Sequence, residues 1–268
     1  MSKKKILLLS DDLRMSSGVG TVSKNFVLGT IDKYDWVQIA GAIKHPEVGK
    51  AVDMNESVRK ETGIEDAYLK IYPTNGYGNQ EMVRTIINVE KVDAILHYTD
   101  PRFWVWLYQM EHEIRQHIPI FYYNIWDDLP YPRYNEFFYE SSDLIMNISK
   151  QTVNIVKNVA QKKPRTDWDC TYIPHGIPED NFKPINELDV DNFDKMNKFR
   201  SSILHNTEKD FVIFWCNRNI RRKVPGDVIL SYKTFCDGLS KEQADKCVLI
   251  MHTAPVDQNG TDLPSVVE

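Results

Sequence analysis

A short run of the chain, residues 217–223, holds three arginines and one lysine directly after an apolar stretch, residues 211–216. The apolar stretch is typical of a buried strand. Open α/β sheets bind ligands at the carboxyl ends of their strands. Arginine binds phosphate oxygens there with two parallel hydrogen bonds, and lysine adds a point charge. The run predicts a diphosphate site, with a solvated basic loop as the plain alternative.

Two glycines near the amino terminus are a second candidate for phosphate contact. Gly18 and Gly20 lie between an apolar strand, residues 5–10, and a helical pattern, residues 19–30. A glycine turn in that position lets backbone N–H groups and the helix N-terminus approach an anion closely. Ser23 occupies the third glycine position of the dinucleotide fingerprint, which disfavours NAD binding. A tight turn without a ligand is the alternative.

The segment 173–184 reads Ile-Pro-His-Gly-Ile-Pro-Glu-Asp-Asn-Phe-Lys-Pro. Its prolines predict a rigid reversal of the chain, which Phe182 can anchor to a core. A single histidine in such a turn, His175, is more often structural than catalytic. We therefore interpret the segment as a structural junction.

The elements that must position these residues alternate between strand and helix. Met82, Ile86 and Val89 are expected on one face of one of these helices. The expected strands are 5–10, 36–43, 67–72, 92–97, 118–126, 144–148 and 170–173, and the expected helices are 19–30, 81–89, 103–114 and 151–160. This order is typical of a doubly wound α/β fold. A polar stretch follows, and then a helix near 195–204, strands 211–216 and 247–251, and a helix at 228–235. We place a domain boundary near Pro184.

Composition narrows the class of protein further. The chain has 268 residues, 42 % apolar and 11 % aromatic, with a net charge of −5. These values exclude a disordered chain and disfavour general binding to nucleic acids or membrane surfaces. No run of about 18 apolar residues predicts a membrane span. The four cysteines form no Cys-x-x-Cys pair, which favours a cytoplasmic location without structural zinc.

Two Asp-x-Asp patterns, 167–169 and 189–191, fit a known metal-binding spacing. Neither follows a strong strand, so we expect no metal site. The aromatic residues around 104–126 are expected in the core. Trp126, Tyr131 and Tyr134 lie past a strand end, where they could instead stack on a sugar or a base.

Taken together, these stretches resemble the GT-B glycosyltransferases, in particular the retaining family-four group. The family's turn between its domains reads Ile-Pro-Asn-Gly-Val-Asp-x-x-x-Phe-x-Pro, and residues 173–184 match it with His175 in place of asparagine. Residues 92–101 and 143–149 resemble two further family segments, and the glycine loop matches in place. Each motif is weak alone, but their order is the family's.

The family's donor motif, Gly-Arg-Leu-x-x-x-Lys-Gly, is matched by Arg218 and Lys223 at the same spacing. Asn217 and Val224 stand where the family has glycines. The resemblance implies that Arg218 and Lys223 bind the donor diphosphate and stabilise the charge that develops on it. No metal and no cofactor are then needed, because the nucleotide-sugar is itself the donor substrate.

The resemblance also implies where the acceptor binds. The family often carries a histidine just after the strand equivalent to 118–126, and this chain has none there. Asn124 or Asp127 lies near that place. We expect the acceptor between the Gly18 loop, Asp100 and Asp127, with Asp127 orienting or deprotonating its hydroxyl.

The implied fold is two Rossmann-like α/β domains of the GT-B type. Residues 1–184 would form the acceptor domain, and residues 185–268 the first part of a donor domain that lacks the family's late Glu-x7-Glu motif. The implied activity is sugar transfer from a nucleotide-sugar to an unidentified acceptor with retention of configuration.

Because the expected donor domain is incomplete, we expect little transfer by this chain alone, and a second chain could complete it. Two further candidate functions stand beside sugar transfer. One is an epimerase or phosphorylase reaction on the same fold, since a fold does not fix a reaction. The second is a non-catalytic sugar- or nucleotide-binding fragment.

Overall fold

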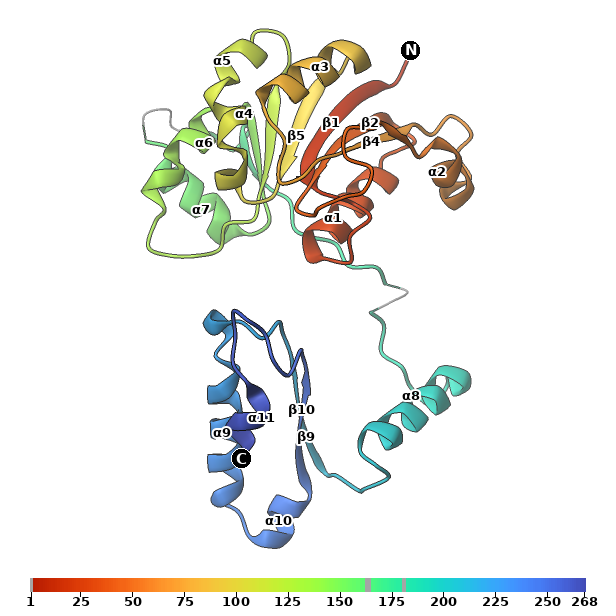
Figure 1. Cartoon of the computed structure of the whole chain (residues 1–268), viewed down its shortest axis with the longest axis vertical. Coiled ribbons are helices and arrows are strands. Elements are labelled where there is room, and N and C mark those ends of the chain that lie inside the picture. The colour runs from red at the N-terminus through yellow and green to blue at the C-terminus, as the bar shows by residue number, and fades with distance from the viewer. Residues whose placement is uncertain (1, 162–164, 180–181) are drawn as a thin grey trace. The chain divides into compact units, whose positions relative to one another are not determined.

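The computed structural model describes residues 2–161, 165–179 and 182–268. The chain divides into two compact units, Met1–Ile177 and Pro178–Glu268, and each has its own sheet (Figure 1). Asp180 and Asn181, inside the 173–184 segment, lie outside the described residues. None of the helices in the described ranges has both the length and the apolar character that crossing a membrane requires.

The first unit is built on a sheet with strand order β3-β4-β2-β1-β5-β6-β7-β8. Its pairs are parallel except for the short antiparallel pair of β3 and β4. The strands are β1 (Lys4–Asp11), β2 (Tyr34–Gly41), β3 (Val52–Asp53), β4 (Leu69–Pro73), β5 (Ala94–Tyr98), β6 (Ile120–Asn124), β7 (Leu144–Asn147) and β8 (Cys170–Tyr172). This is the doubly wound arrangement that the alternation of elements predicted.

Helices cover both faces of this sheet (Figure 1). One face packs against α1 (Gly18–Leu28) and α2 (Asn55–Thr62). The other packs against α3 (Gln80–Glu90), α4 (Val105–Gln109), α5 (Glu111–Ile114), α6 (Glu136–Glu140) and α7 (Lys150–Val159). Because both faces are covered, three consecutive leucines of β1, Leu7 to Leu9, are all fully buried. That burial explains the continuous apolar run in the sequence.

Several predicted elements differ from the structure. The expected helix 103–114 is a 3₁₀ turn, η1 (Pro101–Trp104), followed by α4 and α5, because Pro101 starts a tight turn and the chain breaks again at Met110. The expected strand 36–43 ends at Gly41, and Ala42 adopts a positive φ of 78°. The helix predicted over 81–89 is present as α3, although Val89, at the end of its apolar face, is 66 % exposed.

The residue that α3 buries in place of Val89 is Glu90. Its carboxylate receives hydrogen bonds from Tyr68, Tyr72, Lys70 and Lys5 at 2.6–3.2 Å. Burial of this carboxylate is tolerated because each oxygen has two donors. The apolar period of a helix does not reveal such a network, since its partners come from β1 and β4 and the segment before β4.

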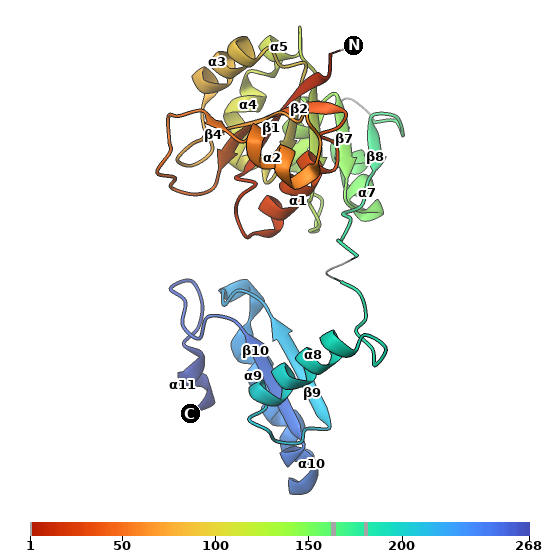
Figure 2. The ribbon, with the colours of Figure 1, turned by 90° about the vertical axis from the view of Figure 1, so that its right-hand side faces the viewer.

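The second unit contains a pair of parallel strands, β9 (Phe211–Cys216) and β10 (Cys247–His252). The helix α9 (Pro225–Asp237) lies beside β10, and α11 (Leu263–Val267) lies beside α9. The second unit also contains α8 (Val190–Ile203), the 3₁₀ turn η3 (Arg221–Lys223) and α10 (Lys241–Asp245). A further 3₁₀ turn, η2 (Arg133–Asn135), belongs to the first unit. Figure 2 shows α8 and α9 on opposite sides of the strand pair. The strand pair is covered loosely enough to leave Phe214 64 % exposed.

Candidate functional site

The direction in which the chain adds strands to the large sheet reverses between the neighbouring strands β1 and β5. From β1 the chain proceeds to β2 and β4 on one side, and β5 is followed by β6, β7 and β8 on the other. Such a switch point is where open α/β sheets bind ligands. The segments that leave the sheet here carry Gly18, Asp100 and Asp127, and each of them belongs to the first unit.

The two glycines are part of a helix and not of a separate turn, which corrects the sequence-based expectation. Gly18 is the first residue of α1, and Ser17 caps it by accepting a hydrogen bond from the Gly20 N–H at 3.0 Å. A Cβ at Gly20 would lie 2.6 Å from the Met15 carbonyl oxygen, whereas Gly18 has open space around it. Gly20 is therefore explained by local packing. Contact of Gly18 and Gly20 with a phosphate stays a prediction.

Asp100 caps the 3₁₀ turn η1 and is tied to an arginine. Its carboxylate accepts hydrogen bonds from the Arg102 backbone N–H and guanidinium at 2.5–3.0 Å. Burial alone would raise the pKa of Asp100, but the bonds from Arg102 outweigh it and hold the pKa below its ordinary value. The guanidinium also lies 5.3 Å from the centre of the Trp126 ring. Asp100 is thus ionised and already paired.

Asp127 lies on the loop after β6 and is exposed. Its backbone carbonyl accepts a hydrogen bond from Gln151 at 3.1 Å, while its carboxylate has no hydrogen-bond partner among the described residues. Asn124, the alternative at this position, is fully buried and is used structurally. Its amide donates to Asn147 at 3.2 Å and accepts from the Trp126 N–H at 3.1 Å. Between the two, only Asp127 has a side chain free for a substrate.

Aromatic residues gather around the same edge. The predicted core aromatics Trp104, Tyr122 and Tyr123 are 1 % exposed or less. The ring of His175 contacts Tyr98 and Tyr123 at centroid distances of 6.1 and 5.4 Å. These contacts fit the structural role that the sequence assigned to His175.

The three aromatic residues past the end of β6 are all at least partly accessible. Tyr131 is 38 % and Tyr134 63 % exposed, and Trp126 packs edge-on against Tyr134 at 5.7 Å. Their stacking on a ligand stays a prediction.

A buried histidine at the end of β5 was not singled out from the sequence. His97 is fully buried, and its Nδ1 lies 2.7 Å from the hydroxyl of Tyr108. Burial lowers its pKa to about 3, so it is neutral at physiological pH. Its Nε2 has no partner in the part of the chain that is described. A neutral imidazole held among Trp104, Tyr108 and Tyr122 is a core residue beneath this edge of the sheet.

The basic run 217–223 follows β9 directly, in the second unit. Its centre is fixed by Asn219, which is fully buried. The Asn219 amide donates to the carbonyls of Ala254, Pro255 and Thr261 at 2.7–3.4 Å and accepts from the Thr261 N–H at 3.0 Å. One carboxamide thus joins the loop after β9 to the loop after β10. The loop backbone is therefore fixed by buried hydrogen bonds, which a fully solvated basic loop would lack.

The cations around Asn219 differ in how they are held. Arg218 Nε lies 3.3 Å from Asp257 Oδ2, and the Arg218 side chain is 68 % exposed while that of Asp257 is 16 % exposed. The backbone N–H of Asn259, together with Arg218, keeps the pKa of Asp257 below its ordinary value. For Lys223 no ion-pair partner occurs among the residues that the structure covers. Arg218 is therefore oriented, and Lys223 is free to meet an anion.

Val224 occupies the position of the family's second glycine. It adopts a left-handed conformation, φ 41° and ψ 51°, immediately before α9. Glycine adopts this conformation at little cost, whereas a β-branched residue is strained there. Val224 is therefore a strained residue at the start of α9.

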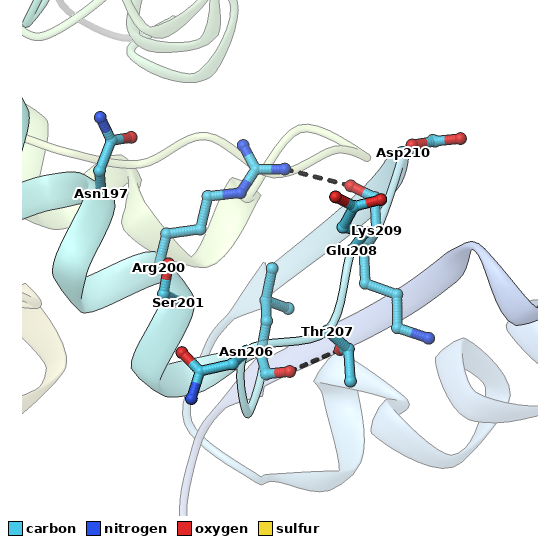
Figure 3. Close-up of a pocket in the computed structure, with 9 residues that line it drawn as sticks. Asn197, Arg200, Ser201, Asn206, Thr207, Glu208, Lys209 and Asp210 are labelled. Carbon is cyan, nitrogen blue, oxygen red and sulfur yellow. Dashed lines mark hydrogen bonds between the residues drawn. The ribbon is translucent and has the colours of Figure 1, made fainter.

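A polar hollow of about 720 Å³ lies elsewhere in the second unit, between the end of α8 and the start of β9. Figure 3 shows Arg200 donating to the carbonyl of Lys209, at 3.2 Å, beside Asn206 and Glu208. This hollow adjoins the amino end of β9, because Asp210 precedes the strand. Ligand sites of α/β sheets lie at the opposite end, so we do not place the site there.

The Asp-x-Asp patterns have local partners. Asp167 pairs with Lys157, and Asp169 pairs with Arg165 and Thr166. Asp189 accepts hydrogen bonds from Asn192. In residues 2–161, 165–179 and 182–268, no three His, Cys, Asp or Glu side chains come together as metal ligands.

The architecture is a GT-B-like, Rossmann-type α/β fold. Among solved structures, the chain is similar to a Listeria monocytogenes protein described as a putative UDP-N-acetylglucosamine 2-epimerase, with a TM-score of 0.51 and 12 % identity over 99 % of this chain. It also aligns with the UDP-GlcNAc 2-epimerase of Neisseria meningitidis bound to UDP-GlcNAc, with a TM-score of 0.48 and 13 % identity over 100 % of this chain. The chain spans 64 % and 68 % of the lengths of these two proteins. No family model and no curated protein matches it.

The Listeria protein supports the fold that the resemblance implied. At 12 % identity it does not show a reaction, and the retaining glycosyltransferase assignment stays a prediction. The roles of Asp100, Asp127, Arg218, Lys223, Gly18 and Gly20 likewise remain proposals.

Proposed function

We propose that the protein is an enzyme that processes a nucleotide-sugar and that the loop 217–223 binds the donor's diphosphate. The observation that carries this proposal is the loop's construction at the carboxyl end of β9. Buried Asn219 fixes the backbone, Asp257 orients Arg218, and Lys223 remains unpaired among the described residues. Fixed cations that face a developing negative charge stabilise it without reorganisation.

Two reactions share this first requirement, because both break the bond between the sugar's C1 and the diphosphate oxygen. In glycosyl transfer, the oxygen of an acceptor hydroxyl forms a bond to C1 and gives its proton to a base, the role proposed for Asp127. In epimerisation at C2 by this route, the proton on C2 and the diphosphate on C1 both leave to give a glycal; a proton then returns to the opposite face of C2, and the same diphosphate oxygen bonds C1 again. The motif order supports transfer, while the 2-epimerase name of the Listeria neighbour supports epimerisation.

One experiment separates these reactions. UDP-N-acetylglucosamine is incubated with the protein in D₂O, with and without a mixture of hydroxylic acceptors, and is followed by proton NMR. Epimerisation predicts a new UDP-sugar that carries deuterium at C2 and forms without acceptor. Transfer predicts UDP release that depends on acceptor. Tight UDP binding without either product would assign the chain to the non-catalytic binding class, and absence of UDP binding would contradict the proposal.

A further inference from the structure

Asp11 ends β1 at the switch point of the large sheet and is used by neither motif. Asp11 as a whole is half-buried, while its Oδ1 atom is fully buried and has no hydrogen-bond partner among the described residues. Buried polar atoms are paired in most proteins, so this half-buried carboxyl group at a ligand-binding edge has an unsatisfied acceptor.

The other carboxylates that flank Asp11 are already paired. Asp12 is buried and bound by the Arg14 guanidinium at 2.7–3.2 Å. Asp100 is bound by Arg102 in the same way. Arginines thereby neutralise Asp12 and Asp100, whereas Asp11 has no cation partner among the described residues. Burial raises the pKa of Asp11, which is consistent with a carboxyl group removed from water.

Tyr77 supplies a second polar group at this place. Its ring stacks on Phe103 at 4.7 Å. A Cβ at Gly41, the residue of β2 that is paired with Asp11, would lie 2.8 Å from the Tyr77 ring, so the ring lies beside Asp11. Burial, together with the charges of Asp11 and Asp100, raises the pKa of Tyr77 to about 12, so its hydroxyl stays protonated. No hydrogen-bond partner of this hydroxyl occurs in the described part of the chain. The position of Tyr77 is thus fixed by packing, while its hydroxyl is unused.

We propose that Asp11 and Tyr77 form a subsite for the hydroxyl groups of a sugar or a related polyol. The Asp11 carboxylate accepts a hydrogen bond from one ligand hydroxyl, and the Tyr77 hydroxyl bonds a second. The unneutralised acid disfavours phosphate, which is why we assign a neutral hydroxylic ligand and not a second anion. The inference rests on the proposed function, because the sugar or acceptor of that reaction would supply these hydroxyls.

The test uses methyl α-D-glucoside as the probe and measures its binding to the full chain by saturation-transfer NMR. Asp11→Asn should weaken binding about tenfold or more, the loss expected for a charge-assisted hydrogen bond. Tyr77→Phe should weaken it about fivefold, as for a neutral hydrogen bond. Circular dichroism checks that each variant is folded, and Tyr77→Phe decides the question if Asp11→Asn does not fold.

Asp35→Asn is the matched control. Asp35 lies in β2 of the same sheet and is also half-buried, and burial is the main cause that raises its pKa. It differs from Asp11 in lying near the amino end of its strand, away from the ligand-binding edge. Its replacement should leave glucoside binding within about twofold. Equal binding by the wild type and both site variants, or no binding by the wild type, would overturn the subsite.

UDP binding, measured in parallel, separates this inference from the proposed function. Loss of glucoside binding in Asp11→Asn with unchanged UDP binding supports both. If UDP does not bind but glucoside binding depends on Asp11, the nucleotide-sugar proposal fails while the subsite stands. If UDP binds and the glucoside binds independently of Asp11, the subsite fails alone.

Discussion

The acidic residues at the edge of the first unit differ mainly in their partners. Asp100 and Asp127 both follow parallel strands, and the sequence predicted that position for each. Their availability was not predictable, because the pairing of Asp100 with Arg102 depends on the 3₁₀ turn that begins there. The unpaired Asp11 oxygen was equally hidden, since the sequence shows only an acidic end to an apolar run.

At the residue scale, we expect the two arginines of the basic run to contribute unequally. Arg218→Ala should weaken UDP binding by about 1.5–3 kcal/mol, because it removes a charge-assisted hydrogen bond from an oriented side chain. Arg221→Ala, the matched control, should cost less, because it lies off the family's motif positions. Isothermal calorimetry measures both, and equal losses would reduce the loop to a general basic surface.

Asp127 is expected to act on the reaction and not on donor binding. Asp127→Asn removes a proton acceptor but keeps the side chain's size, so turnover should fall while UDP affinity stays nearly unchanged. Asp128→Asn is the control, because that carboxylate already accepts the Leu129 N–H at 2.9 Å. Initial rates and calorimetry check this pair, and unchanged turnover in Asp127→Asn would remove Asp127 from the mechanism.

At the scale of single elements, Val224 stores strain at the start of α9. A left-handed conformation costs a non-glycine residue about 1–2 kcal/mol. Replacing Val224 by glycine removes this cost, but the greater freedom of glycine in the unfolded chain offsets part of the gain in the free energy of unfolding. Val224→Gly should therefore stabilise the second unit by about 1 kcal/mol. Hydrogen exchange of the β9 and β10 amides measures the change.

The control for this substitution is Val256→Gly, in an exposed loop of the same unit. Val256 is 59 % exposed and has no positive φ. Glycine there should only add freedom to the unfolded chain, which destabilises by about 0.5–1 kcal/mol. Destabilisation of similar size by both substitutions would show that Val224 is unstrained.

The Glu90 network should make the first unit sensitive to acid. Burial alone would raise the pKa of Glu90, but hydrogen bonds from Tyr72, Tyr68, Lys70 and Lys5 outweigh it and lower the pKa to about 2. A lowered folded-state pKa stabilises the fold above the ordinary carboxyl pKa, and this contribution is lost as the pH falls toward 2.

Glu90→Gln should consequently destabilise the first unit by about 3 kcal/mol at neutral pH. The difference from the wild type should shrink below about pH 4. Glu81→Gln, at the exposed start of the same helix, is the control and should cost well under about 1 kcal/mol. Urea unfolding at several pH values measures these differences, and a pH-independent loss would contradict the network's ionised state.

The elements themselves were predicted best where one physical cause dominates. A continuous apolar run identified β1, because a strand that is covered on both faces needs no polar face. The apolar runs of β9 and β10 also identified strands, but Phe211, Val212 and Phe214 of β9 are exposed and not buried as the run predicted. The segment 103–114 was mispredicted, since its aromatic residues fit a helical period while Pro101 and the turn at Met110 divide the backbone. The burial of Glu90 was not predictable from the period of α3, because its partners Lys5, Tyr68, Lys70 and Tyr72 come from other segments of the chain.

At the scale of the whole molecule, the two units should differ in local stability. Leu7 to Leu9 of β1 are fully buried, whereas Val212 and Phe214 of β9 are 37 % and 64 % exposed. Amides protected by few buried contacts open at lower free energy. Hydrogen exchange should be faster across 205–268 than in β1 and β5, and equal protection of β9 and β1 would contradict this.

The loop after β9 is proposed to bind the diphosphate of a nucleotide-sugar. Titration of UDP into ¹⁵N-labelled protein tests it most directly. Diphosphate binding at this loop should give saturable shifts that are largest for the amides from Arg218 to Gly226, and these shifts should be lost in a variant carrying Arg218→Ala and Lys223→Ala. No saturable shift, or shifts confined to residues of the first unit and retained in that variant, would contradict the claim.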